Sequence, residues 1–463
     1  MGKDAVADKE RVAASSVDVP GTGLPANAAA GLDAFWMPFT ANKRFKASPR
    51  MLVAAEGMYF TTDDGRKVLD GTAGLWCVNA GHGRRAIADA VHRQLLTLDY
   101  APAFQLGHPV AFEFANRLAE IAPAGLDRIF FTGSGSESND TALKMALAYH
   151  RANGQGSRTR LIGRELGYHG VGFGGISVGG IGNNRRGFGA LLPGVDHLRH
   201  TLERRSAFSR GQPELGAELA DDLERLIALH GAETIAAVVV EPVSGSAGVI
   251  VPPKGYLERL RSICTQHGIL LIFDEVITGF GRLGTPFAAD YFGIRPDIIC
   301  TAKGLTNGVA PMGAVFASRD IHDTIVEKSS GDGIEFFHGY TYSGSPMTAA
   351  AGIATLDIYQ SENLLHRPPE LIKYWEDALH SLRGLPHVVD VRNLGLMGAV
   401  ELESRPGKPG SRAMDVSIDC FKSGAIVRSN AGDVLALSPP LILETKHVDE
   451  LVGIMGAAIK LVA

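Results

Sequence analysis

Two short segments place an acid and an amine directly after apolar runs. Asp274 follows Ile269–Phe273, and Lys303 follows the shorter run Asp297–Cys300 in a glycine-flanked turn. Such runs are typical of strands buried on both faces, and open α/β sheets bind ligands at the carboxyl ends of their strands. We therefore expect both side chains at one edge of a single sheet. This pair suits pyridoxal 5′-phosphate (PLP), which forms a Schiff base with a lysine and needs an acid at its pyridine nitrogen.

Each of these two residues also has a plainer interpretation. An aspartate after a strand commonly caps a helix or a turn. A lysine in a glycine-rich loop is commonly a solvated surface charge. The chemical interpretation of Asp274 and Lys303 therefore depends on further signals elsewhere in the chain.

A Gly/Ser-rich turn, Thr132–Asp140, lies between a predicted strand at Ile129–Phe131 and a predicted helix at Thr141–His150. The backbone N–H groups of a helix N-terminus bind anions, and serine hydroxyls add donors. An ordinary serine cap is the alternative, but the doubled Gly-Ser favours phosphate. No Gly-Lys-Ser/Thr follows, so the turn is not a Walker loop.

The segment Gly167–Gly180 matches two popular motifs, G-x-G-x-x-G and G-x-S-x-G, the second centred on Ser177. Both require a strand before the motif and a helix directly after it. Because Gly179–Arg186 is a poor helix former, we dismiss both motif matches. Tyr168, an aromatic residue on a glycine-rich loop, is suited to stack on a planar ring.

The alternation of strands and helices across residues 129–317 predicts a mostly parallel sheet. A hairpin is predicted within 51–70, and a strand at 235–240 ends before the acidic Glu241. Residues 346–463 carry the pattern of a separate α+β unit. We expect three parts: a leader and part of a small domain at 1–75, a large domain at 76–345 and the remaining small domain at 346–463. Further helices are predicted at 86–98, 254–266 and 369–382 and from 447, and further strands at 314–317, 388–392 and 398–402.

Composition excludes several classes of function. The 463 residues carry a net charge of −5, with 45% hydrophobic and 21% charged residues, and form no basic stripe for nucleic acid. The four cysteines stand without a C-x-x-C pair, so neither a disulfide framework nor a metal site is expected. No apolar run approaches a membrane span, and the N-terminus lacks a signal-peptide core. We expect a cytoplasmic protein whose residues 1–30 are a loose leader.

Four segments together resemble one enzyme family. They are Phe273–Arg282 (FDEVITGFGR), Ala302–Gly308 (AKGLTNG), Ser134–Ser138 (SGSES) and His338–Gly344 (HGYTYSG). From about Trp36 to the C-terminus the chain resembles class III (subgroup II) PLP-dependent aminotransferases of fold type I. Within them it is most similar to the ω-amino acid–pyruvate, or β-alanine–pyruvate, group. The resemblance implies an α/β fold with a mostly parallel central sheet in a large domain plus a smaller α+β domain.

The resemblance also implies a reaction and a site. An amino group would pass from an ω-amino acid or primary amine to pyruvate by a ping-pong mechanism, with Lys303 as Schiff-base lysine and proton shuttle and Asp274 at the ring nitrogen. The other cofactor-binding residues that it implies are Ser134, Gly135, Ser136, Tyr168, Glu241, Val276 and Thr341. The implied substrate-binding residues are Phe39, Leu75, Trp76, Phe104 and Arg428.

Two of these implied residues bear on partners and substrates. Thr341 matches a residue that reaches the phosphate of a neighbouring subunit, which implies a homodimer with shared sites, or a tetramer built from it. Arg428 matches a mobile arginine that meets the substrate carboxylate, in a loop that we expect to be one residue longer than usual. From residues 71–83 alone, a buried tryptophan anchoring the loop explains Leu75 and Trp76 equally well.

Four alternatives stay open at this point. An aminotransferase using 2-oxoglutarate would need a second carboxylate partner, and none is identified in the sequence. A glutamate-1-semialdehyde 2,1-aminomutase would transfer the amine within one molecule, and the Leu75-Trp76 pair argues against it. A serine hydrolase would rest on Ser177 alone. A non-catalytic PLP-binding protein would keep Lys303 without reacting with amines. The natural amine donor is not determined.

Overall fold

The computed structural model describes residues 31–329, 331–430 and 432–462, so the predicted leader at 1–30 lies outside the described residues. The chain divides into two compact units, one of residues up to Ala54 with Phe60–Lys67, the other of Ala55–Tyr59 with Val68–Ala463. The first unit holds α1 (Asn42–Ala47) and most of β1 (Leu52–Glu56) and β2 (Tyr59–Thr62). A turn after β2, closed by the Thr62 N–H donating to the Arg66 carbonyl (3.0 Å), confirms the predicted hairpin.

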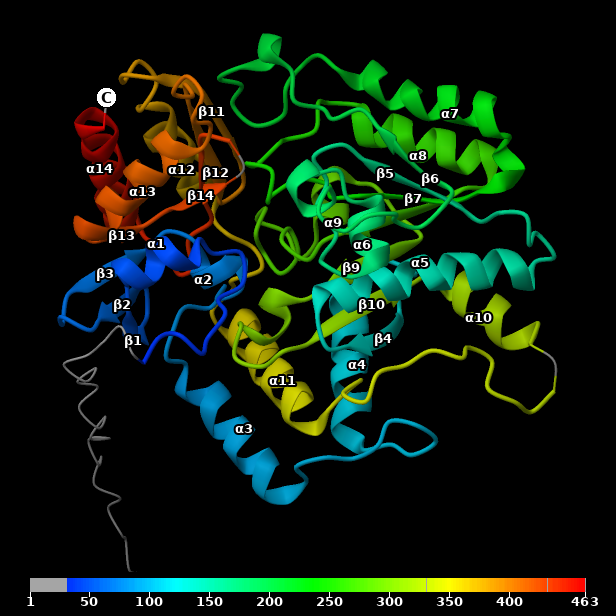
Figure 1. The fold of residues 1–463 in the computed structure, drawn as a ribbon. Coiled ribbons are helices and arrows are strands. Elements are labelled where there is room, and N and C mark those ends of the chain that lie inside the picture. Colours follow the sequence, from blue (N-terminus) through cyan, green and yellow to red (C-terminus); the bar gives the residue numbers. More distant parts are fainter. Residues whose placement is uncertain (1–30, 330, 431, 463) are drawn as a thin grey trace, which may run out of the picture. The chain divides into compact units, whose positions relative to one another are not determined.

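A seven-stranded sheet with the order β4-β10-β9-β8-β7-β5-β6 forms the centre of the second unit (Figure 1). Its strands are β4 (Arg128–Thr132), β5 (Arg160–Arg164), β6 (Val195–Leu198), β7 (Ile235–Val240), β8 (Leu270–Asp274), β9 (Ile298–Thr301) and β10 (Gly313–Ala317). Strands β9, β8, β7, β5 and β6 run parallel, whereas β10 is antiparallel to both β4 and β9. The prediction of a mostly parallel sheet is confirmed.

Helices cover both faces of this sheet (Figure 1). They are α4 (Pro109–Ile121), α5 (Gly135–Ala152), α6 (Phe173–Val178), α7 (Asp222–His230), α8 (Tyr256–His267), α9 (Ala288–Phe292), α10 (Arg319–Glu327) and α11 (Pro346–Ser361). Helix α3 (Arg85–Thr97) packs against α11. Alternate residues of each strand join different apolar clusters. In β8, Leu270 and Ile272 pack with α5 and α10, whereas Leu271 and Phe273 pack with α7 and α8. The same alternation turns Asp274 toward α5.

The start of α5 corrects one prediction. The helix begins at Gly135 rather than at Thr141, so the Gly/Ser turn is itself the first turn of the helix. Ser134 is the N-cap, and its side chain accepts from the Glu137 N–H (3.2 Å). The Glu137 carboxylate reaches back to the Gly133 N–H (2.6 Å). This pairing is close to a capping box, a start signal stronger than the helix-disfavouring glycine and serines that follow it.

The C-terminal part forms a second layer in the same unit. A sheet with the order β11-β12-β15-β14 is covered by three helices, as predicted for an α+β unit. Its elements are α12 (Pro369–His380), β11 (Val388–Leu394), β12 (Met397–Leu402), α13 (Ser411–Lys422), β14 (Arg428–Asn430), β15 (Val434–Leu437) and α14 (Thr445–Leu461). Between them, β13 (Ala425–Ile426) pairs in parallel with β3 (Lys67–Asp70). This pairing connects the C-terminal layer to the segment that precedes residues 71–83.

Candidate active site

Strands β8 and β9 bring Asp274 and Lys303 to the same edge of the sheet. The two strands are parallel neighbours, and Asp274 lies opposite Cys300 in the register. Lys303 then opens a 3₁₀ turn, Lys303–Thr306, with φ = 51°, a left-handed conformation that is costly for a residue other than glycine. Strained residues of this kind occur preferentially at functional sites.

The amine of Lys303 is mostly buried, and its electrostatic neighbours are functional candidates too. Burial lowers the pKa of Lys303 to about 8, the carboxylate of Asp274 opposes this shift, and the charge of Arg428 adds to it. Near neutral pH an appreciable fraction of this amine is therefore uncharged, unlike an ordinary lysine. An uncharged amine can both attack a carbonyl and accept a proton.

Asp274 accepts hydrogen bonds from three donors. Its Oδ2 accepts from Asn139 Nδ2 (2.9 Å) and His169 Nδ1 (2.8 Å), and its Oδ1 accepts from the Val276 N–H (3.1 Å). The side chain is 4% exposed, so these bonds replace nearly all of its water. Sequence reasoning missed Asn139 and His169 as partners. The sequence pattern predicts a loop for the turn of α5 that carries Asn139, and nothing local connects either residue to β8.

The tautomer of His169 follows from this geometry. An ionised carboxylate only accepts, so Nδ1 must carry the proton. The buried Nε2 of His169 has no hydrogen-bond partner within the described residues, and the same holds for Oδ1 of Asn139. A second proton on His169 would therefore be buried without an acceptor.

The first turn of α5 meets the loop after β5 to form an anion cradle. Gly135 packs against Val276, since a Cβ at position 135 would lie 3.0 Å from Val276 Cγ2. Ser136 Oγ accepts from the Val171 N–H (3.1 Å). The N–H groups at the start of an 18-residue helix, with Ser134 and Ser136 beside them, suit a phosphate group.

Glu241, directly after β7, positions the Tyr168 loop. Its carboxylate accepts from the Tyr168 N–H (2.9 Å) and the Gly245 N–H (3.0 Å). Burial raises the pKa of Glu241 to about 7. Burial also raises the pKa of Tyr168, while the charge of Arg428 lowers it. Tyr168, Arg428 and Lys303 therefore lie within one electrostatic neighbourhood.

The remaining predicted site residues lie in different surroundings. Leu75 is exposed, whereas Trp76 is 3% exposed and packs in an apolar cluster. Phe104 is exposed. Thr341 is also exposed, and its backbone carbonyl accepts from the Tyr100 hydroxyl (3.1 Å). Phe39 is an exposed residue of the first compact unit.

Three buried polar side chains that sequence reasoning missed connect the catalytic segments. Arg282 donates to Asn79 Oδ1 (2.8 Å), and Asn79 Nδ2 donates to the Phe280 carbonyl (3.0 Å). Asn307, four residues after Lys303, accepts from the Ala80 N–H (2.8 Å). The motifs around 273–282 and 302–308 therefore also hold the 71–83 loop. The sequence does carry a signal for these contacts, because Arg282 and Asn307 are polar residues within largely apolar or glycine-rich motifs.

Ser177 is not available as a nucleophile. It lies within α6 and is fully buried. Its hydroxyl donates to the Phe173 carbonyl (2.5 Å) and accepts from the Leu192 N–H (3.0 Å). These bonds explain why the G-x-S-x-G match has no chemical meaning here.

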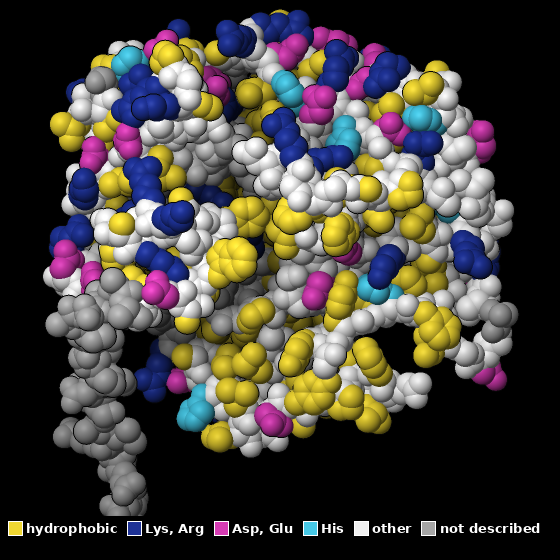
Figure 2. Space-filling model, in the orientation of Figure 1, with side chains coloured by type: hydrophobic (Ala, Val, Ile, Leu, Met, Phe, Trp, Pro, Cys, Tyr) yellow, Lys and Arg dark blue, Asp and Glu magenta, His cyan; other side chains and the backbone are white. Residues whose placement is uncertain are grey.

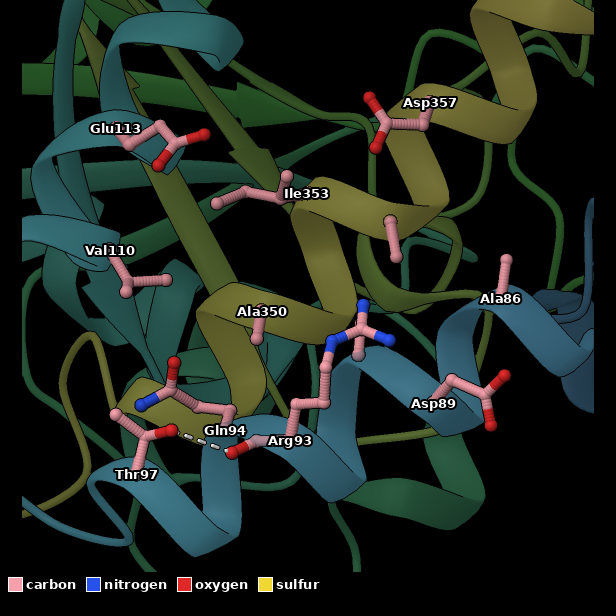
Figure 3. Close-up of a pocket in the computed structure, with 12 residues that line it drawn as sticks. Ala86, Asp89, Arg93, Gln94, Thr97, Val110, Glu113, Ala350, Ile353 and Asp357 are labelled. Carbon is pink, nitrogen blue, oxygen red and sulfur yellow. Dashed lines mark hydrogen bonds between the residues drawn. The ribbon is translucent and has the colours of Figure 1, made fainter. Parts of the chain in front are cut away.

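A groove of about 650 Å³ lies elsewhere, between α3, α4 and α11 (Figure 3). Its walls mix alanines with Asp89, Arg93, Glu113 and Asp357, and include no predicted site residue. In the described part of the chain, no helix is long and apolar enough to cross a membrane. Within the same residues no cluster of three His, Cys, Asp or Glu side chains could hold a metal ion, and the four cysteines are free.

Comparison with known proteins identifies the family of the chain. The family model "Aminotransferase class-III" matches residues 40–459. The chain belongs to the class-III aminotransferases. These enzymes depend on PLP and have the type I fold, so the predicted fold, cofactor and enzyme class are confirmed, and the hydrolase alternative is excluded.

Relatives and solved structures show the same similarity. The chain is 62% identical over 430 residues to an omega-aminotransferase of Caulobacter vibrioides, covering 93% of this chain and 98% of the relative. It is 51% identical over 441 residues to a beta-alanine–pyruvate aminotransferase of Pseudomonas aeruginosa, covering 95% and 98%. Its fold matches an omega transaminase of Pseudomonas jessenii in complex with PMP, with a TM-score of 0.86, 32% identity and coverage of 92% and 96%.

The described residues fit PLP. A largely buried amine with a lowered pKa, a buried carboxylate and a glycine-lined helix N-terminus would hold, respectively, the aldehyde carbon, the ring nitrogen and the phosphate of this coenzyme. Oδ2 of Asp274 has two donors and Oδ1 has one. Because each carboxylate oxygen has two lone pairs, Oδ1 keeps room for a further donor.

Proposed function

We propose that this aminotransferase moves an amino group from an ω-amino acid or related primary amine, such as β-alanine, to pyruvate, giving alanine by a ping-pong mechanism. Two relatives that cover more than nine-tenths of the chain are named for ω-amine and β-alanine–pyruvate transfer. The observation that carries the proposal is the position of Arg428, a largely buried guanidinium in the electrostatic neighbourhood of both Lys303 and Tyr168.

Lys303 is the proposed proton carrier. PLP, when bound, supplies a carbonyl carbon that joins the amine and a ring that takes up an electron pair. Because the pKa of Lys303 is lowered to about 8, its amine can accept a proton from a substrate carbon and return it near neutral pH. Asp274, which accepts hydrogen bonds from three donors, would pair with the ring nitrogen of the coenzyme.

Arg428 is proposed to select the acceptor. It begins β14, in a hairpin with β15, and burial lowers its pKa. A guanidinium binds a carboxylate through two parallel hydrogen bonds, so it suits the α-carboxylate of pyruvate. An amine donor that lacks a carboxylate does not need this contact, which lets one site serve both half-reactions.

Arg428→Ala tests this assignment. We expect pyruvate kcat/KM to fall about 100-fold, because a charge-assisted bond worth about 3 kcal/mol is lost, while the half-reaction with an aryl-alkyl amine changes little. Arg199→Ala, at an exposed arginine paired with Asp222, is the matched control. Equal losses in both half-reactions would contradict the role of Arg428.

The function itself is tested by a panel of amine donors crossed with pyruvate and 2-oxoglutarate, followed as separate half-reactions by absorbance. Activity with β-alanine and pyruvate well above that with 2-oxoglutarate is expected. Borohydride reduction followed by peptide mapping should label Lys303, and Lys303→Ala should remove both the label and the activity. A label on another lysine, or a preference for 2-oxoglutarate, would refute the proposal.

The predicted homodimer is retained as part of this proposal. Exposed apolar side chains gather on the loop between α3 and α4, on the loop before α11 and on α4 itself. Figure 2 shows hydrophobic side chains concentrated over this part of the molecule. The patch consists of Tyr100, Phe104, Leu106, Phe112, Phe337 and Tyr342. Its two loops contact each other through the Tyr100 and Tyr342 rings (6.4 Å). An exposed apolar surface of this kind is typical of subunit interfaces, and Thr341 lies within it.

Subunit complementation tests the shared site. Lys303→Ala and Thr341→Arg subunits are each expected to be inactive as homodimers. In a hybrid dimer, one site combines the intact Lys303 of one chain with the intact Thr341 of the other. About half of the activity of a wild-type dimer should therefore return in purified hybrids. Hybrids without activity would show that Thr341 does not serve the neighbouring subunit.

A further inference from the structure

A buried carboxylate, Asp70, organises the loop from residue 70 to residue 82. It ends β3 and is 0% exposed. Its Oδ1 accepts from the backbone N–H (2.9 Å) and the hydroxyl (3.0 Å) of Thr72. Its Oδ2 accepts from the Gly74 N–H (2.6 Å) and pairs with His82 Nε2 (2.8 Å). All four lone pairs of this carboxylate are therefore used within one loop.

The backbone that Asp70 holds is strained. Ala73 has φ = 45°, Gly74 has φ = 64° and Trp76 has φ = 64°, so three residues of this turn lie in the left-handed region. Only glycine adopts that region without cost, and a tryptophan with positive φ is uncommon. Such a conformation persists only where the surroundings over-determine it. The donors of Thr72 and Gly74 to Asp70 supply that constraint.

This turn sends two large side chains in different directions. Trp76 is buried in an apolar cluster with Val243 and Ile277, which follow β7 and β8. Leu75, its neighbour, is 53% exposed. The tryptophan therefore anchors the turn, and the strained backbone determines where Leu75 points.

The turn lies beside the lysine segment. A Cβ at Gly308, in the loop after Lys303, would lie 2.9 Å from Cys77 Sγ. Burial raises the pKa of Cys77, and the nearby charge of Lys303 opposes that rise. Asn307 donates to the Gly81 carbonyl (2.9 Å), which ties the far end of the loop to the same segment. A change in the turn therefore changes the wall next to the reactive amine.

We propose that Asp70 is a positioning residue that determines which amine donors the enzyme accepts, because its carboxylate holds the strained turn Thr72–Trp76 and thereby the position of Leu75. The inference rests on the proposed function and on the substrate-binding role that the family resemblance implies for Leu75. Asp70 itself touches neither substrate nor Lys303. Its substitution should alter the discrimination between donors rather than the attachment of PLP.

The test compares Asp70→Asn with wild-type holoenzyme. An asparagine keeps one oxygen for Thr72 but places an amide nitrogen against the Gly74 N–H, so the turn relaxes. We expect kcat/KM for β-alanine to fall about tenfold relative to that for 1-phenylethylamine, because the smaller donor depends more on a closely fitting wall. The visible absorbance of bound PLP and borohydride labelling at Lys303 should stay as in the wild type.

Two further variants keep the test decisive. Thr72→Val removes the hydroxyl bonds to Asp70 (3.0 Å) and to the Gly74 carbonyl (2.9 Å) but keeps the backbone donors to Asp70. It should shift the donor ratio in the same direction by a smaller factor, and it decides the question if Asp70→Asn does not fold. Asp222→Asn, another buried aspartate that accepts a backbone N–H (from Arg199, 2.8 Å), is the matched control and should leave the ratio unchanged.

Failure of the inference and failure of the proposed function give different results. A wild-type enzyme that transfers no amine from either donor to pyruvate would refute the function. If the wild-type enzyme is active, a donor ratio unchanged in Asp70→Asn and Thr72→Val overturns the role of Asp70. Loss of the Lys303 label in Asp70→Asn, with both donors affected equally, would also overturn it.

Discussion

Asn139→Leu tests the support of Asp274 from α5. Leucine has the same heavy-atom branching as asparagine but cannot donate, so Oδ2 of Asp274 would lose its 2.9 Å bond and keep the one from His169. A hydrogen bond to a charged group contributes about 1.5–3 kcal/mol. The carboxylate of Asp274 would become that much less stable as an anion. If the ring nitrogen of PLP shares a proton with Asp274, that proton would then shift from the nitrogen toward the carboxylate.

The expected kinetic effect follows from this shift. PLP accepts an electron pair well only while its ring nitrogen is protonated. If most of the lost energy appears in the transition state, the rate of the amine half-reaction falls about 10- to 100-fold. Rapid-mixing absorbance with saturating amine measures that rate directly. The pH at which the bound coenzyme changes colour should shift as well, which distinguishes an electrostatic role from misfolding.

Controls separate Asn139 from general damage to α5. Asn153→Leu changes an asparagine at the C-terminal end of the same helix and should leave the half-reaction unaffected. His169→Phe removes the other donor to Oδ2 (2.8 Å) and should cause a loss of similar size. A half-reaction within twofold of wild type in fully loaded Asn139→Leu would refute the view that these donors hold the charge on Asp274.

Two further predictions concern stability. In Gly163→Ala the new Cβ would lie 1.8 Å from the Val178 carbonyl oxygen, so the free energy of unfolding should fall by about 3 kcal/mol in denaturant titrations; Gly156→Ala, which meets nothing within 4 Å, is the control, and equal losses would contradict the packing argument. Burial raises the pKa of Glu275 from 4.5 to about 7, so this group favours folding most at acid pH and its contribution is lost as the pH rises through 7. Glu275→Gln should therefore reduce the decline in stability between pH 5 and 8 by about 3 kcal/mol; an unchanged slope would count against it.

The edge of the sheet was predictable from local patterns. Apolar runs ending in Asp274 and shortly before Lys303 indicate buried parallel strands, and parallel strands end at the same edge. The antiparallel direction of β10 was not predictable, because an apolar strand of Gly313–Ala317 looks the same in either orientation. The start of α5 was placed too late because glycine and serines disfavour a helix locally, whereas the cap at Ser134 starts one.

By itself the sequence determined the chemistry: an amine and a carboxylate after buried strands, a glycine-serine turn for phosphate, and the family that combines them. Only the tertiary structure decided which side chains support that chemistry. Asn139 and His169 converge on Asp274, and Asp70 holds the strained turn before Trp76. The reason is physical, since residue type and spacing report a strand's burial and period. Which polar groups satisfy a buried charge depends on contacts between segments far apart in the chain.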